Sequence, residues 1–374
     1  MMTLLTEGAA LTSNTVLGQA APSVMDIDGA YWLSVLLKIA FVLGLFFVVP
    51  LIGGYLEHKA MARMQHRRGP VEAGPFGSLQ LVADGIKFIQ KEDIIPAAAD
   101  RWVFAIAPGV ALVPAMLIFL VVPLGPGVWA EDLELGLFYA LAITSITVIG
   151  ILMGGWASAN KFSLIGGMRA AAQLIAYELP LFLAAVAVAV QAGTLSLVGI
   201  VEAQSGFMLP GTEINVWFVF PQIIGFSIFF LAAMAELSRP PFDMPIADSE
   251  LVFGYMTEYT GIKYAMYMLT EYAGMITMSA LIVVLYLGGW QILPGVPLPG
   301  CEGAAGLFDC GFRGTLLGVG VTMGKVMALV FVFVWARVAY PRLREDQLQR
   351  MSWLVLIPLS LVNLAAVAVL KVVF

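Results

Sequence analysis

The chain has 374 residues, of which 60% are hydrophobic and only 12% charged, with a mean hydropathy of +0.93 and a formal net charge of −6. So little polar surface excludes a water-soluble globule, and lipid must therefore surround most of the chain. The apolar runs are each about 20 residues long and do not alternate, which excludes a β-barrel and predicts an all-α integral membrane protein.

The first 30 residues contain no Lys or Arg and no compact apolar core, so they lack the parts of a signal peptide. We interpret residues 1–30 as a tail and residues 31–374 as a single polytopic membrane domain. Within this domain we predict eight membrane-spanning helices. Their expected ranges are 31–56, 102–124, 135–157, 171–192, 217–237, 265–289, 315–337 and 352–373.

The basic residues predict the orientation of these helices. Seven of the 19 Lys and Arg residues lie in the loop 57–101, and others follow the third, fifth and seventh predicted spans. The segments on the opposite side carry only Arg313. Because cytoplasmic loops retain positive charge, we expect both termini to face outward and the loop 57–101 to face the cytoplasm.

Residues 74–93, GPFGSLQLVADGIKFIQKED, have the pattern of an amphipathic helix. The apolar positions, three or four apart, are Leu79, Val82, Ile86 and Ile89, and the polar positions of the other face are Gln80, Asp84, Lys87 and Lys91. Such a helix lies in the membrane interface. It either forms the lip of a lateral opening for a lipid-soluble substrate or only anchors the loop to anionic lipid.

Three ionisable residues fall deep inside predicted spans. Glu178 lies nine residues after Arg169, and Glu271 eight after Lys263, so both are about 12–13 Å into the membrane. Lys325 lies at a comparable depth in the seventh span. Each charge at the membrane centre costs about 2.5–3.5 kcal/mol unless it is paired or hydrated. Either a Lys–Glu pair joins the helices, or, as we expect, a hydrated polar pathway carries protons or ions.

The segment AELSRPPFDMPIADSELVFGYMTEY, residues 235–259, gathers five carboxylates in one loop, namely Glu236, Asp243, Asp248, Glu250 and Glu258. Crowded like charges raise one another's pKa, so their protonation responds to a new negative charge nearby. Arg239 is a possible counter-ion of Glu250. An ordinary solvated acidic face is the alternative, but the prolines and the apolar LVFGYM run within the loop argue against it.

The sequence contains few residues that hold redox cofactors. It has two His and two Cys, which do not suffice for an iron–sulfur cluster, and we expect no metal site. Cys301 and Cys310 both lie in the outward segment GCEGAAGLFDCG, where they form either a disulfide or two free thiols. We therefore expect that this chain carries no electrons on a cofactor of its own.

Long stretches of the chain resemble a known family. The match runs from about Leu51 to the C-terminus and is carried by RMQHRRGPVEAGPFGSLQLVADGIKFIQKED, GGWASANKFSLIGGMRAAAQLIAYEL, the acidic loop and YPRLREDQL. These strings are similar to the quinone-site membrane subunits of NADH:quinone oxidoreductase, respiratory complex I.

The resemblance implies a subunit that joins the hydrophilic arm of such a complex to its proton-pumping arm. Quinone is then the substrate, no cofactor is bound covalently, and iron–sulfur clusters and flavin reside on partner subunits. The implied partners are the other subunits of both arms, quinone and membrane lipid, with no nucleic acid. The implied location is an energy-transducing membrane, such as the bacterial inner membrane.

The resemblance also implies roles for particular residues. Catalytic positions beside the quinone chamber match Glu236, Arg239, Asp243, Glu250 and Glu258. Positions at the quinone entrance match Glu57, Arg63, Arg67, Asp84 and Lys87, and those of a proton pathway match Glu178, Glu271, Asp248 and Lys325. A quinone that takes up electrons would be the negative charge to which the acidic loop responds.

The chain departs from the family pattern at three places. His58 stands where an Arg usually follows the Glu, Ile246 replaces a common Glu, and Ser145 stands where some members carry a Glu. Two other functions remain open. The membrane subunit of an energy-converting hydrogenase-type complex is disfavoured by the loop 57–101, and a free-standing ion transporter by the absence of repeats and interrupted helices from the sequence.

Overall fold

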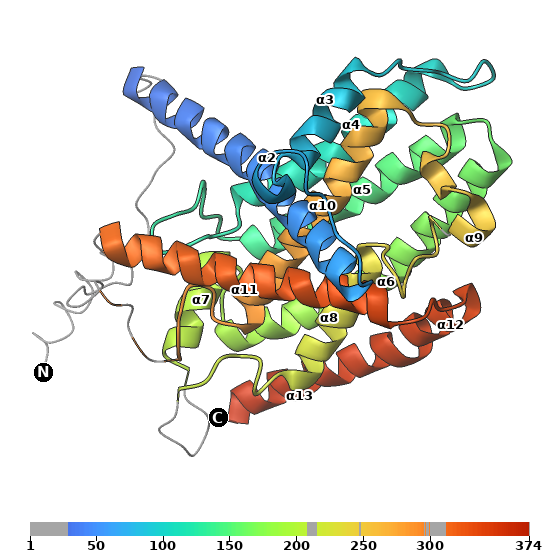
Figure 1. Cartoon of the computed structure of the whole chain (residues 1–374). Helices are drawn as coiled ribbons and strands as arrows, with labels where there is room; N and C mark the ends of the chain where they lie inside the picture. The colour runs from blue at the N-terminus through green and yellow to red at the C-terminus, as the bar shows by residue number, and fades with distance from the viewer. Residues whose placement is uncertain are drawn as a thin grey trace, which may run out of the picture. The chain divides into compact units, whose positions relative to one another are not determined.

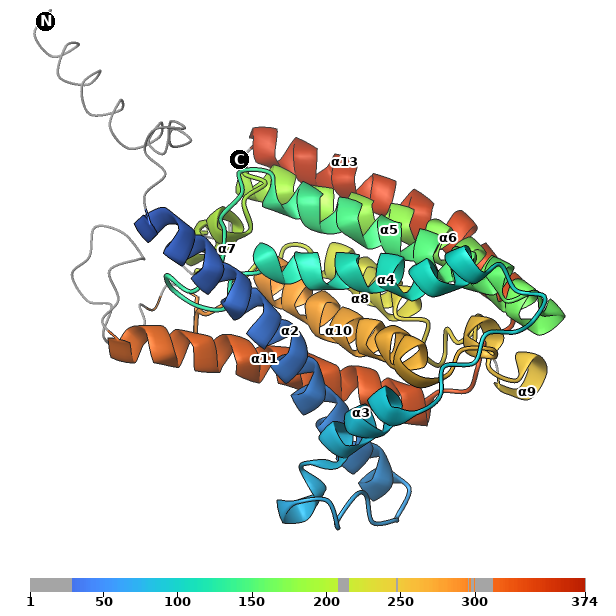
Figure 2. The ribbon, with the colours of Figure 1, turned by 90° about the horizontal axis from the view of Figure 1, so that it is seen from above.

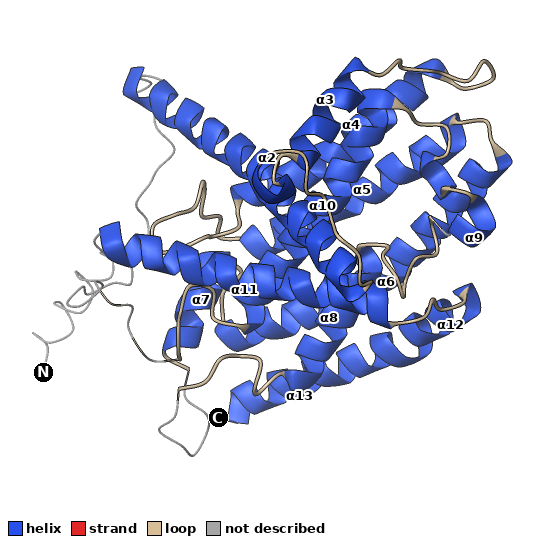
Figure 3. Cartoon of the chain, in the orientation of Figure 1, coloured by secondary structure: helices blue, strands red, loops and turns tan. Residues whose placement is uncertain are grey.

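The computed structural model describes residues 29–207, 215–246, 248–294, 296, 299 and 312–373. This part of the chain is helical and contains no strand beyond an isolated bridge between Gly125 and Val128 (Figure 3). The all-α prediction is confirmed. The proposed pair Cys301 and Cys310, and almost all of the predicted tail, lie outside the described residues.

Figure 1 shows the helices, labelled and coloured in their order along the chain. Their bounds are α2 (Gly29–Met64), α3 (Gln80–Gln90), α4 (Arg101–Leu117), α5 (Gly136–Ala157), α6 (Lys161–Ala192), α7 (Leu197–Ser205), α8 (Ile223–Glu236), α9 (Asp248–Leu251), α10 (Gly261–Tyr286), α11 (Phe312–Ala339), α12 (Glu345–Arg350) and α13 (Ile357–Val373). Short 3-10 turns lie at Pro75–Gly77, Ile118–Leu120 and Gly254–Met256, and a π-helical turn lies at Met351–Leu356.

Within the described residues, seven helical segments are long and apolar enough to cross a membrane. They confirm seven of the eight predicted spans. The eighth, expected at 217–237, corresponds to α8, which has only 14 residues. At about 1.5 Å per residue α8 is shorter than the ~30 Å hydrocarbon core. Pro221 explains the late start, because the residue before a proline is disfavoured in the α conformation.

The chain divides into two compact units, Met1–Leu43 and Gly44–Phe374. The described part of the first unit is the beginning of α2, where large apolar side chains such as Trp32 and Leu36 are exposed. The second unit contains the rest of α2 and all other helices. The residues discussed below belong to this second unit.

In the second unit, α4, α5, α6 and α10 lie side by side (Figure 2). Glycines permit the closest approach, because a Cβ on Gly155 of α5 would lie 2.9 Å from the Cα of Gly167 on α6. Helix α6 begins at Lys161, ten residues before the predicted span, with the Asn160 side chain accepting a hydrogen bond from the Phe162 amide. This extension places Arg169 on the helix.

The apolar part of the acidic loop packs into the core between these helices. The Phe104 and Tyr259 rings stack with centroids 4.1 Å apart, and Tyr255 and Tyr267 complete the cluster. Gly254 has a φ of +55°, and a Cβ there would lie 1.9 Å from the Pro245 carbonyl oxygen. The loop therefore folds back into the protein. Its apolar residues are needed for this packing, which explains why they occur between the acids.

Candidate functional site: one buried and one exposed cluster of charges

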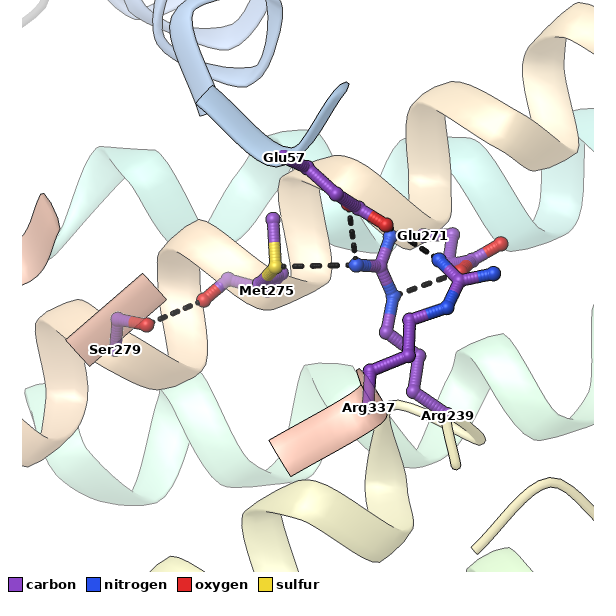
Figure 4. Close-up of polar contacts among 6 residues, drawn as sticks. All are labelled: Glu57, Arg239, Glu271, Met275, Ser279 and Arg337. Atoms are coloured by element: carbon purple, nitrogen blue, oxygen red, sulfur yellow. Dashed lines mark hydrogen bonds and ion pairs between the residues drawn. The ribbon is translucent and has the colours of Figure 1, made fainter. Parts of the chain in front are cut away.

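Four ionisable side chains meet inside the protein, and we call them the buried charge cluster: Glu57, Arg239, Glu271 and Arg337 (Figure 4). Arg239 Nη1 lies 2.6 Å from Glu57 Oε2, and Arg239 Nε lies 2.8 Å from Glu271 Oε1. Arg337 Nη1 pairs with the other oxygen of Glu57. Glu57 thus binds two arginines, while Arg239 binds two carboxylates.

Three helices and one loop position this cluster. Helix α2 continues past the predicted end at residue 56, so Glu57 stays on the helix and is fully buried. One turn earlier, a Cβ on Gly53 would lie 2.9 Å from Ile276 Cδ1, which shows how closely α2 approaches α10. Arg239 comes just after the end of α8, with its guanidinium 3.3 Å from Met275 Sδ.

Arg239 remains charged in this environment. Burial by itself lowers the pKa of a guanidinium, but the Glu271 and Glu57 carboxylates outweigh it and hold the pKa of Arg239 above its usual value. The Tyr272 ring adds a cation–π contact at 5.1 Å. Such a buried network is sensitive to the loss of any member, because removing one partner leaves an uncompensated charge.

Two cavities lead away from the buried charge cluster. The first, of about 80 Å³, is lined by Glu271, Glu236 and Thr144 among others, and the second, of about 340 Å³, by Glu236, Thr144 and Glu178. Both exceed the ~10–15 Å³ that one water requires. Glu236 lies on both cavities, and its Oε2 atom is buried without a hydrogen-bond partner among the described residues. Carboxylates and water-sized spaces therefore alternate from Glu271 to Glu178.

At the far end of this series, Glu178 accepts a hydrogen bond from the Ser145 hydroxyl. Ser145 is one of the positions at which the sequence departs from the pattern of the family that it resembles. The serine supplies a neutral hydroxyl to Glu178 instead of a second negative charge, so the two side chains attract each other. The polar series therefore continues through Ser145 even without a carboxylate at this position.

A second group of four charges lies at the protein surface, and we call it the exposed charge cluster: Arg169, Glu250, Arg342 and Glu345. Arg169 Nη1 lies 2.7 Å from Glu250 Oε2, and Arg342 Nη1 lies 3.4 Å from Glu250 Oε1. The cluster lines an open cavity of about 720 Å³. The hydrogen bond from Arg169, followed by the charge of Arg342, holds the pKa of Glu250 below its usual value.

This geometry corrects two expectations about the acidic loop. Arg239 is not the counter-ion of Glu250, because Arg239 binds Glu57 and Glu271 while Glu250 binds surface arginines. The acids also do not form one crowded group, since Glu236 lines the cavities and Glu258 accepts a hydrogen bond from Asn160 at 2.5 Å.

The two remaining carboxylates of the acidic loop are Asp243 and Asp248. Asp243 is half-buried. Burial, followed by the charge of Glu271 and smaller contributions from Tyr264 and Asp243, raises the pKa of Tyr255 well above its usual value. The side chain of Asp248 is outside the described part of the structure. The loop therefore divides its carboxylates between the interior and the surface.

Lys325 does not pair with a glutamate, which was one expectation for it. The Lys325 ammonium donates hydrogen bonds to the carbonyl oxygens of Leu287, Gly289 and Gln291, at 2.6, 3.0 and 2.6 Å. It also lies 4.4 Å from the centre of the Trp217 ring. The cation therefore satisfies three backbone carbonyls of the segment that follows the carboxyl end of α10.

The amphipathic helix predicted in the loop 57–101 is confirmed as α3. Its apolar side chains Leu79, Val82, Ile86 and Ile89 are all exposed. On the other side, the Phe88 ring lies 5.4 Å from that of Tyr264 on α10, and Lys87 Nζ lies 3.3 Å from Asp84 Oδ1.

The remaining residues expected at the entrance do not gather beside α3. Glu57 belongs to the buried charge cluster. Arg67 is exposed and donates to Gln65 Oε1 at 2.7 Å, and Arg63 lines a separate groove against α11. Only Asp84 and Lys87 of the five predicted entrance residues therefore lie on α3.

Sequence reasoning did not identify Arg337 or Arg169 as site residues. Both were interpreted only as positive charges that mark the cytoplasmic ends of spans. Arg337 contacts a residue 280 positions away, and Arg169 contacts Glu250 81 positions away. No pattern of neighbouring residues predicts such pairs. The only signal in the sequence is that acids inside spans require a counter-charge or hydration.

Several apolar helices that enclose paired charges and polar cavities define a multi-pass membrane protein. Residues 37–368 match the family model described as NADH dehydrogenase, so the chain belongs to this family. The resemblance found in the sequence is thereby confirmed.

The relatives within the family match this chain over most of their own length. The chain is 44% identical to the H subunit of the NADH-quinone oxidoreductase of Geobacillus kaustophilus over 316 residues, which are 84% of this chain and 87% of the relative. It is also 44% identical to the proteins of the same name from Geobacillus thermodenitrificans and Bacillus anthracis, over 85% of this chain and 88% of each relative. These relatives belong to a multi-subunit oxidoreductase.

Proposed function

We propose that this chain is the membrane subunit of a proton-translocating NADH:quinone oxidoreductase that helps to form the quinone chamber and couples quinone reduction to proton movement. The observation that carries the proposal is the continuity between the buried charge cluster and the cavities at Glu236 and Glu178. Quinone is the substrate, and the iron–sulfur clusters and flavin that deliver electrons reside on partner subunits.

In this proposal, the coupling between quinone reduction and proton movement starts from the negative charge of the reduced quinone. A quinone that gains electrons near the cytoplasmic loops changes the electrostatic potential at Arg239, whose two carboxylate partners are held at 2.6 and 2.8 Å. In a poorly solvated site such a change is weakly screened. Proton affinity at Glu271 then changes, and the protons move by way of Glu236 to Glu178 through water in the two cavities.

The quinone enters beside α3. The exposed apolar face of this helix suits the membrane interface, and Asp84 and Lys87 provide a polar rim. The proposed location is the bacterial inner membrane with both termini outward. The single membrane domain 31–374 then contains no redox cofactor of its own.

A pair of matched variants tests this function in the assembled complex. Glu271→Gln keeps the side chain's size and neutralises one member of the buried charge cluster, whereas Glu345→Gln makes the same change in the exposed charge cluster. NADH oxidation is measured with an artificial acceptor and with quinone in the same membranes. We expect Glu271→Gln to lose quinone-linked activity and retain the artificial-acceptor activity, while Glu345→Gln retains both. Full quinone-linked turnover and pumping in Glu271→Gln would refute the coupling role.

A further inference from the structure

The last turns of α2 and the middle of α11 enclose a groove that no residue of either charge cluster lines. Its volume is about 740 Å³, within the ~300–1,000 Å³ range of small-molecule sites. The apolar lining residues are Leu56, Ala60, Met64, Gly324, Met327, Ala328, Val330, Phe331 and Val334. No described atom lies within 4 Å of a Cβ position on Gly324, so the groove is open there.

The two charged residues in the lining are both cations, Lys59 and Arg63, and no carboxylate of the described residues lines the groove. Arg63 is exposed, and within the part of the chain that the structure describes its side chain makes no hydrogen bond or ion pair. Lys59 Nζ donates to the Pro70 carbonyl at 2.5 Å and lies 5.7 Å from the centre of the Tyr55 ring, which leaves further donor capacity. The groove therefore contains two cations that can pair with a bound anion.

The dimensions of the groove match one leaflet of a bilayer. From Gly324 to Val334, α11 rises about 15 Å, which is half of the ~30 Å hydrocarbon core. The end of α2 beside it continues into the basic segment QHRRG, as expected where a helix leaves the membrane on its positive side. Apolar walls of this length therefore end near cations at a membrane surface.

We propose that this groove binds an anionic phospholipid, with an acyl chain along Met327 and Phe331 and the phosphate paired with Arg63 and hydrogen-bonded by Lys59. The charges favour a lipid over an apolar helix of a partner subunit, because such a helix would leave Arg63 without a counter-charge. The lipid holds α2 against α11 at a place distinct from the proposed quinone entrance. This binding is independent of the proposed catalytic function.

Photo-crosslinking in the purified intact complex tests the proposal. The complex is placed in nanodiscs that contain either phosphatidylglycerol or phosphatidylethanolamine carrying a diazirine in the acyl chain, and adducts on residues 324–334 are quantified by mass spectrometry. We expect phosphatidylglycerol to label this segment more strongly. Arg63→Gln should reduce that preference about fivefold, the contribution of one basic residue near anionic lipid.

Two further variants serve as controls. Arg67→Gln removes an equally exposed arginine that does not line the groove, so the preference for phosphatidylglycerol should persist. Gly324→Leu fills the groove without changing charge, so labelling by both lipids should fall. An unchanged preference in Arg63→Gln, an equal loss in Arg67→Gln, or no labelling of 324–334 in the wild-type complex would overturn the proposal.

Discussion

The two charge clusters have the same composition, two glutamates and two arginines, yet they lie in very different surroundings. The contrast lies in the carboxylates: Glu57 and Glu271 of the buried charge cluster are 0% and 16% exposed, whereas Glu250 and Glu345 of the exposed charge cluster are each 52% exposed. Among the arginines, Arg239 is 6% exposed, Arg337 at the edge of its cluster is 35% exposed, and Arg169 and Arg342 are 24% and 27% exposed. Equal numbers of ion pairs therefore do not imply equal effects on stability or function.

The physical reason for the difference is screening. Water surrounds the exposed pairs, and such pairs contribute about 0.2–1 kcal/mol each. Removing one member of a buried pair instead costs about 3–5 kcal/mol, because the other charge remains without compensation. The same poor solvation that makes the buried charge cluster fragile would also make it respond to a charge change in the proposed neighbouring quinone.

We expect the largest effect from Arg239→Met, which removes the cation shared by Glu57 and Glu271. The free energy of unfolding should fall by about 3–5 kcal/mol, and little assembled complex should remain in the membrane. Native gel electrophoresis of solubilised membranes measures the amount of complex. Arg342→Met is the matched change in the exposed charge cluster, and a similar loss of complex there would remove the distinction between the two regions.

A smaller effect, on turnover and not on assembly, is expected for Glu178→Gln. The substitution keeps the hydrogen bond to Ser145 possible but removes the carboxylate that the proposed pathway needs to take up and release protons. Quinone-linked turnover should fall by about a hundredfold or more, as for other lost proton-transfer groups. NADH oxidation with an artificial acceptor is the control, and a parallel decrease in that activity would indicate a folding defect instead.

The entrance residues should affect binding more than turnover. Asp84→Asn and Lys87→Gln each break the 3.3 Å ion pair on α3, and we expect the apparent KM for quinone to rise a few-fold, about the effect of one interfacial charge. Steady-state kinetics with a short-chain quinone measure it. Unchanged KM values in both variants would argue against an entrance at α3.

Glu250→Gln should have the smallest effect and a defined pH dependence. Because the pKa of Glu250 is lowered in the folded protein, its contribution to stability is fully present above the unfolded value of about 4.3 and is lost as the pH falls through the folded value. The difference in Tm between wild type and variant should therefore stay constant from about pH 6 to 8. A difference that varies in this interval would contradict the assignment of Glu250 to an exposed, ionised pair.

The sequence predicts local features of this protein well. Hydropathy located seven spans, and the spacing of Leu79, Val82, Ile86 and Ile89 predicted α3, because both patterns depend on residues close together in the chain. Proximity in the sequence did not predict which residues form ion pairs. Glu57 is 182 residues from Arg239, and the nearer Glu250 lies at the surface. Which charges meet depends on how α2, α10 and α11 pack, and hydropathy does not encode that packing.

In the proposed pathway, Glu236 connects the buried charge cluster to Glu178 through the two cavities that it lines. The most direct test is the number of protons translocated per NADH oxidised, measured in inverted membrane vesicles for Glu236→Gln and, as a control, Glu345→Gln. We expect Glu236→Gln to assemble and to oxidise NADH with an artificial acceptor at the normal rate, but to lose quinone-linked proton translocation. A normal proton yield and normal quinone turnover in Glu236→Gln would contradict a pathway through this carboxylate.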